Sequence, residues 1–132
     1  MVVDSSALVA ILTNEPERDR FIDAIASADQ RLLSALNLFE TQIVLHRRAG
    51  AGPVLHLQEF LLRGRFDVLG FDEQQARHAL AAYRRFGKGS GSKARLDLGD
   101  CAAYALATSL DLPLLFKGED FHHTDVRPAL AG

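Results

Sequence analysis

The chain has 132 residues, 48% of them hydrophobic and 24% charged, which is the composition of one globular domain with a hydrophobic core. Its single cysteine, Cys101, excludes an internal disulfide framework and fits a reducing compartment, so we expect a cytoplasmic protein. No basic segment leads into an apolar run at the N-terminus, and no run has the length of a membrane helix. Neither a signal peptide nor a membrane anchor is therefore predicted, and the net charge of −2 does not by itself indicate a nucleic-acid binder.

Short strands alternate with helices through the first half of the chain. Val2 and Val3 form a short apolar strand, and we expect a helix to follow it with Ser5 and Ser6 as the N-cap. A second helix restarts at Pro16, which suits a first turn and precedes apolar residues at helical spacing. The other predictions for this half are a strand at 31–34, a helix at 35–48 and a helix at 54–62.

The second half continues the alternation. We expect a strand at 66–69, a helix capped by Asp72, a flexible loop of glycine and serine at 87–93, a helix at 98–110, a strand at 113–116 and a last edge strand at Val126. Strands that alternate with helices over long connections favour a mostly parallel β-sheet with helices on both faces, a three-layer α/β fold. Neither a repeat nor a linker divides the chain, so residues 1–132 are predicted to form a single domain.

Two acidic residues follow predicted strands. Asp4 comes directly after Val2 and Val3, and Asp120 lies just beyond the strand at 113–116. Functional sites of open parallel sheets form at the carboxyl ends of the strands. We therefore expect both carboxylates at the same edge of the sheet.

Glu40 is an acid on a helix whose neighbouring positions are apolar. Leu36, Ile43 and Val44 share its side of the predicted helix. A carboxylate that faces a core is costly unless it is paired or binds a metal. Two structural explanations stay open, because Glu40 could reach water at the edge of the apolar stripe or pair with Arg47.

Asp97 and Asp100 stand three residues apart at the start of the predicted helix at 98–110. Asp97 occupies the position of an N-cap, and this role alone would explain it. Asp100 lies in the first turn, where the helix dipole favours a negative charge. Each of the acids thus has an ordinary structural explanation when it is taken alone.

Together, the acids predict a metal site. Four carboxylates gathered at one edge repel one another, and such a cluster needs raised pKa values or a bound cation. Ligands that are all oxygen favour Mg²⁺, with Mn²⁺ as a substitute, over zinc. We therefore expect Mg²⁺ as the cofactor.

Basic residues are segregated from the acids. The segment Arg77–Arg95 contains no acid, and Arg47–Arg65 forms a second basic group. Solvated helix faces are the simpler explanation, but a basic rim around an acidic centre would also give this pattern. The basic residues that we expect to contact a nucleic acid are Arg84, Arg85, Lys88, Lys93 and Arg95.

Four segments in order resemble the PIN-domain ribonucleases, and among them the VapC toxins of bacterial toxin–antitoxin modules. The resemblance covers nearly the whole chain and rests on VVDSSALVAIL, NLFET, LDLGDCAAYALA and LLFKGEDFHHTDV. It implies a PIN-like fold and a metal-dependent endoribonuclease that hydrolyses RNA phosphodiesters. It also implies a homodimer and a cognate antitoxin whose C-terminal segment blocks the active site.

The resemblance carries the catalytic acids of the family onto Asp4, Glu40, Asp100 and Asp120. Asp4 and Asp100 would hold the metal, with Asp120 and Asp97 as further ligands. Family members commonly have a polar residue, often Asn, where this chain has Asp97, so that acid either adds to the metal site or only caps its helix. The small hydroxyl residues that match positions near the site are Ser6 and Thr124.

Two other functions fit parts of the sequence. A Mg²⁺-binding phosphoacceptor receiver domain also gathers acids at strand ends, and Lys117 follows a strand as its lysine would. However, 35–62 reads as helical and supplies no acid at the end of a central strand. A catalytically idle interaction module with a PIN fold is the other alternative, and the retention of the whole acidic set argues against it.

Overall fold

A computed structural model describes residues 1–131 and contains one four-stranded sheet with strand order β3-β2-β1-β4. The strands are β1 (Val2–Val3), β2 (Leu32–Ser34), β3 (Asp67–Leu69) and β4 (Leu114–Leu115). The helices are α1 (Ser5–Leu12), α2 (Arg18–Ser27), α3 (Ala35–Ala49), α4 (Ala51–Arg63), α5 (Glu73–Phe86), α6 (Leu98–Ser109) and the short 3₁₀ helix η1 (Asp120–His123). All strand pairs are parallel, which confirms the predicted α/β class.

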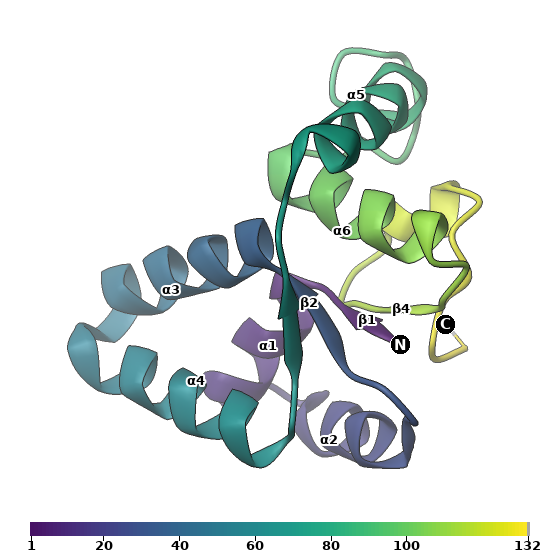
Figure 1. Cartoon of the computed structure of the whole chain (residues 1–132). Helices are drawn as coiled ribbons and strands as arrows, with labels where there is room; N and C mark the ends of the chain where they lie inside the picture. The colour runs from purple at the N-terminus through teal and green to yellow at the C-terminus, as the bar shows by residue number, and fades with distance from the viewer. Residues whose placement is uncertain (132) are drawn as a thin grey trace.

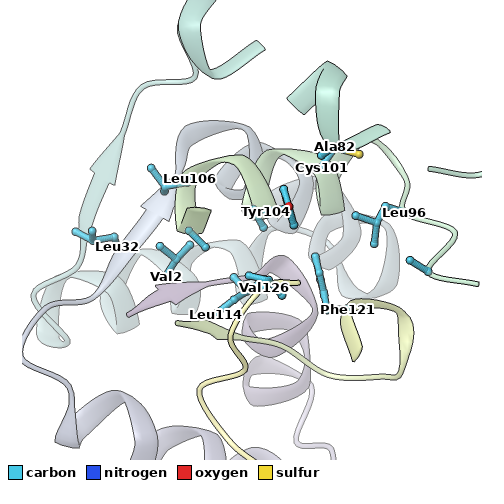
Figure 2. Close-up of a cluster of buried hydrophobic side chains, with 13 residues drawn as sticks. Val2, Leu32, Ala82, Leu96, Cys101, Tyr104, Leu106, Leu114, Phe121 and Val126 are labelled. Atoms are coloured by element: carbon cyan, nitrogen blue, oxygen red, sulfur yellow. The ribbon is translucent and has the colours of Figure 1, made fainter. Parts of the chain in front are cut away.

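The sheet separates two hydrophobic cores, and Figure 1 shows α5 and α6 on one side of it and α1, α3 and α4 on the other. Successive residues of a strand point to opposite faces, so each strand supplies both cores. Val2 belongs to the core beneath α6, together with Leu114 and Phe121 (Figure 2). Val3 and Leu115 belong to the core beneath α1. The three layers therefore agree with the sequence-based expectation.

Three helices begin differently from the prediction, whereas the ends of the helices at 35–48, 54–62 and 98–110 differ by one residue. The N-cap of α1 is Asp4 rather than a serine, because the Asp4 carboxylate accepts the Ser6 N–H. The helix α2 begins at Arg18, two residues after Pro16. The helix α4 begins at Ala51 instead of residue 54.

The junction of α3 and α4 explains the last of these differences. Gly50 is the C-cap of α3 and has a φ of 78°, which a glycine adopts without steric cost. The chain therefore turns within this one residue and re-enters helical conformation at once. Pro53 lies in the first turn of α4, where a missing N–H leaves no helical hydrogen bond unmade.

The edge strand predicted at Val126 is not formed. Val126 is buried in the core beneath α6, and the contact with the sheet is a single parallel bridge between Leu114 and Pro128. Proline has no N–H to donate to a ladder, so the segment pairs at one point rather than along a strand.

The loop between α5 and α6 is closed at its base. Lys88 N–H donates to the Leu96 carbonyl over 3.0 Å, and Leu96 N–H donates to the Phe86 carbonyl over 2.8 Å. The side chain of Leu96 is buried, which anchors the loop to the core. The turn at its tip uses Gly89 and Gly91, whose φ values of 87° and 88° suit glycine.

Within residues 1–131, no helix is long and apolar enough to span a membrane.

Candidate active site

Asp4 is a buried carboxylate at the carboxyl end of β1, with 2% of its surface exposed. Its Oδ2 accepts the Ser6 N–H over 3.0 Å and the Ser6 hydroxyl over 2.6 Å. Its Oδ1 is buried and has no hydrogen-bond partner. Buried carboxylate oxygens normally have partners, so Asp4 has an oxygen that is available to a ligand besides the one that caps α1.

The protonation of Asp4 reflects this environment. Burial raises the pKa of the carboxyl from 3.8 to about 6, and the negative charges of Glu40 and Asp97 act in the same direction. The two hydrogen bonds from Ser6 oppose this shift because they stabilise the ionised form. A cation beside Asp4 would reverse the effect of burial.

Asp97 and Asp100 form a reciprocal capping box at the start of α6. The Asp100 N–H donates to Asp97 Oδ1 over 2.9 Å, and the Asp97 N–H donates to Asp100 Oδ2 over 3.0 Å. Asp97 is therefore a helix cap, as one of its two predicted roles requires. Burial raises the pKa of Asp100, and the negative charge of the Asp4 carboxylate raises it further. The two carboxyl groups therefore lie close together.

Glu40 reaches the same place from α3. Its carboxylate lies directly against Gly99 in the first turn of α6, and it is half-buried. No ion pair joins it to Arg47 among residues 1–131, and its partly exposed carboxylate reaches water within the pocket, as the first of the two structural explanations requires. Together, the acids line one pocket at the carboxyl edge of the sheet: Asp4, Glu15, Glu40, Asp97 and Asp100.

Asp120 and Thr124 lie apart from this pocket. Asp120 is exposed in η1 and is not among the residues that line the pocket, which instead has Lys117 and Gly118 from the same segment. The Thr124 hydroxyl donates to the Phe121 carbonyl and accepts the Val126 N–H, so both of its hydrogen bonds lie within its own turn. That either residue acts at the site stays a prediction.

Lys117 forms an ion-pair group at the mouth of the pocket that the sequence did not reveal. Its ammonium pairs with Glu15 and, over 3.3 Å, with Glu17, and Arg48 lies 3.8 Å from Glu15. The Lys117 N–H also donates to the Ser6 hydroxyl over 3.0 Å. Ser6 therefore links Asp4 to the segment that follows β4, and Ser6 itself lines the pocket.

Asn37 was also missed. It is fully buried on α3, one turn before Glu40, and its side-chain amide donates to the Ser5 hydroxyl over 3.1 Å and to the Gly99 carbonyl over 3.0 Å. The sequence did contain a signal for Asn37, because it stands four residues before Thr41, so the two polar residues share one face of the helix. Both residues are buried. Asn37 thus joins the first turns of α1 and α6 to α3.

The predicted basic residues lie on the exposed surface of α5 and the following loop. Arg85 pairs with Asp125 over 3.6 Å and lies over the ring of Phe86. Lys93 and Arg95 are exposed on the loop that leads into Asp97. Their contact with a nucleic acid stays a prediction. Phe121, an aromatic residue next to Asp120, is buried in the core beneath α6.

The pocket has the chemistry of a Mg²⁺ or Mn²⁺ site. Its candidate ligands are carboxylate oxygens, and Asp4 Oδ1 is an acceptor with no protein partner. Within residues 1–131, no three carboxylate, imidazole or thiol side chains are arranged as a complete set of metal ligands. Mg²⁺ commonly binds through one or two carboxylates and keeps several waters, so the residues present fit this ion.

Comparison with known proteins gives consistent matches over nearly the whole chain. The family model described as PIN domain matches residues 1–127. Ribonuclease VapC28 of Mycobacterium tuberculosis is 46% identical over 130 residues, which cover 98% of this chain and 98% of that protein.

Solved structures share the fold. VapC20 of Mycobacterium tuberculosis, a sarcin-ricin loop cleaving toxin, aligns with a TM-score of 0.76 at 19% identity, over 96% of this chain and 98% of that chain. A toxin–antitoxin complex from Klebsiella pneumoniae aligns with a TM-score of 0.67 at 16% identity, over 91% of this chain and 88% of that chain.

Proposed function

The chain belongs to the PIN domain family and, within it, to the VapC ribonucleases, and from this premise we propose that it is a Mg²⁺-dependent endoribonuclease toxin. The observation that carries the proposal is the Asp4 carboxylate. It is buried, it leaves Oδ1 without a partner, and it lies beside Glu40, Asp97 and Asp100. A cluster of this kind costs stability in the absence of a cation, so an interaction module without catalytic function would have no use for it.

The proposed division of roles follows from burial. Asp4 and Asp100 would hold the ion, because Asp4 Oδ1 has no protein partner and the two carboxylates are close enough for the charge of Asp4 to raise the pKa of Asp100. The ion would polarise the scissile phosphate and lower the pKa of a bound water. Glu40 is less buried than Asp4 and lines the same pocket, from where it would orient that water and accept its proton. Asp120 is proposed to act from η1, either as a further ligand or as a group that contacts the RNA.

RNA would approach along the basic surface beside the pocket. Lys93 and Arg95 are exposed just before Asp97, so a backbone held by them lies near the acids. Such contacts position an RNA without reading its sequence. We infer that single-stranded or loop RNA is the substrate, because sequence-specific proteins read exposed bases.

Two protein partners are proposed. An antitoxin is inferred from membership of the VapC ribonucleases, and the toxin–antitoxin complex from Klebsiella pneumoniae shares the fold. A homodimer is inferred from an apolar surface next to the site, where Leu36, Leu80 and Leu98 line one groove and Phe39 is 64% exposed one turn away. Sedimentation of the purified toxin would test the dimer. We place the protein in the cytoplasm, where its RNA substrates are.

The test of the enzymatic function is RNA cleavage by the purified protein, free of antitoxin. Wild type is expected to cut RNA in Mg²⁺ or Mn²⁺ and to stop in EDTA. Asp100→Asn, which keeps the shape of the side chain and removes its charge, is expected to lose cleavage in Mg²⁺. Equal cleavage in EDTA, or an active Asp100→Asn variant, would contradict the proposed site.

A further inference from the structure

Gly99 has no side chain at the one point where α6 meets the Glu40 carboxylate. A Cβ built on Gly99 would overlap with both carboxylate oxygens of Glu40 and would lie 2.5 Å from its carboxyl carbon. Neither the backbone conformation of Gly99 nor a turn demands glycine here, because the residue is the second of a regular helix. Glycine is therefore needed here because the Glu40 carboxylate occupies the space that a side chain at residue 99 would fill.

The first turn of α6 is held in place while Glu40 is free to move. The Gly99 carbonyl accepts the Asn37 amide over 3.0 Å, and the Asn37 amide also donates to Ser5, so α6 cannot shift away from α3 without breaking a buried hydrogen bond. The Glu40 carboxylate, by contrast, is the end of a flexible side chain. A methyl group on Gly99 would thus move the carboxylate rather than the helix.

We propose that Gly99 is a positioning residue, which leaves the Glu40 carboxylate the room that it occupies in the acid pocket, and that Asn37 sets the separation of α3 and α6 on which this depends. The inference rests on the proposed function for its catalytic meaning. The contact itself is a property of the metal-free protein and can be tested without RNA.

Gly52 provides a matched control. It is the second residue of α4, as Gly99 is of α6, and a Cβ built on it meets nothing within 4 Å. Alanine is a better helix residue than glycine, so Gly52→Ala is expected to raise the melting temperature by up to about 3 °C. It should leave RNA cleavage unchanged, since Gly52 lies outside the pocket.

The first experiment is a thermal unfolding cycle in EDTA with Gly99→Ala, Glu40→Ala and the double variant. With Glu40 present, Gly99→Ala should give no rise in melting temperature, because the methyl group displaces the carboxylate. With Glu40→Ala, the same change should give the rise seen for Gly52→Ala. Residues in contact show this non-additivity. An equal rise with and without Glu40 would overturn the proposal.

The second readout is Mn²⁺ binding by calorimetry together with RNA cleavage. Gly99→Ala is expected to leave the Mn²⁺ affinity near that of wild type, because Asp4 and Asp100 hold the ion, whereas cleavage should fall on the order of 10²-fold, as for a misplaced catalytic group. In the Glu40→Ala protein, Gly99→Ala should cause no further loss. Unchanged cleavage in Gly99→Ala would show that Gly99 does not position Glu40 for the reaction. If wild type cuts no RNA, the enzymatic proposal fails, and the unfolding cycle still decides whether Gly99 sets the place of Glu40.

Discussion

The Ser6 hydroxyl donates a 2.6 Å hydrogen bond to Asp4 Oδ2, and the same hydroxyl accepts the N–H of Lys117 at the end of β4. This hydrogen bond lowers the pKa of Asp4 because it stabilises the ionised carboxylate, whereas burial raises the pKa. Ser6 thus keeps Asp4 closer to the charge state that a metal requires.

Replacement of this hydroxyl is expected to change the pH dependence of cleavage. Ser6→Ala removes one of the two hydrogen bonds to Asp4, so the pKa of Asp4 should rise further and the acid limb of kcat/KM against pH should move to higher pH. Ser6→Thr keeps a hydroxyl and should restore the wild-type profile. A profile that does not move in Ser6→Ala would separate this hydroxyl from the ionisation of Asp4.

The stability of the metal-free protein is expected to fall as pH rises. An unfolded Asp4 titrates near 3.8, whereas the folded one keeps its proton up to about 6, so the folded state binds more protons between these values. The free energy of unfolding then decreases over this range by at most roughly 3 kcal/mol. Asp100, whose pKa is also raised, extends the decrease to higher pH.

Thermal unfolding in EDTA between pH 4 and 8 measures this effect, with Asp4→Asn as the comparison because it cannot ionise. The melting temperature of wild type should fall relative to that of Asp4→Asn as pH rises, and Mg²⁺ should reverse the fall. A difference between the two proteins that is constant with pH would mean that Asp4 does not titrate in this range.

Loss of a basic loop residue is expected to reduce the salt dependence of RNA binding. If Lys93 contacts a phosphate, Lys93→Ala should lower the slope of log affinity against log salt by about 0.7 for single-stranded RNA. Binding is measured in the Asp100→Asn background so that the RNA stays intact. Arg18→Ala is the control, because Arg18 pairs with Asp19 on α2, outside the acid pocket. Equal slopes for the two variants would exclude Lys93 as an RNA contact.

Removal of the Tyr104 hydroxyl is expected to destabilise the fold without affecting the pocket. Tyr104 donates to Asp125, which ties the C-terminal segment to α6, and burial raises the pKa of the phenol to about 12. Tyr104→Phe should lower the free energy of unfolding by about 1–3 kcal/mol, the range for a hydrogen bond to a charged group. Tyr83→Phe removes an exposed hydroxyl that donates to the Lys88 carbonyl, and it should lower the free energy of unfolding by less than Tyr104→Phe does. Denaturant unfolding compares the two.

The sequence predicts the layers well because strand burial and helix periodicity are local patterns. The structure explains why an acid follows the first strand, since one carboxylate oxygen of Asp4 caps α1 and the other is buried without a hydrogen-bond partner. The N-cap was nevertheless assigned to the serines. Both residue types cap helices, and only the course of the backbone after Val3 decides between them.

The contacts that complete the pocket join residues far apart in the chain. Asn37 and Gly99 are 62 residues apart, and Lys117 reaches Ser6 across 111 residues. No spacing rule connects such pairs, so a single sequence does not contain a local signal for them. Asp120 is a different case, because η1 begins five residues after β4 ends and the end of the strand alone does not determine where this side chain lies.

The structure of the loop between α5 and α6 allows its tip to change in sequence while the start of α6 stays in place. Its base is closed by the hydrogen bonds of Leu96 with Phe86 and Lys88, while its glycine-rich tip lies in solvent. Residues inserted or exchanged at the tip therefore do not displace the capping box of α6, because the strain ends at the base. Such a loop can change in length and charge while the acid pocket keeps its geometry, and if Lys93 and Arg95 contact RNA, substrate preference can evolve independently of the chemistry.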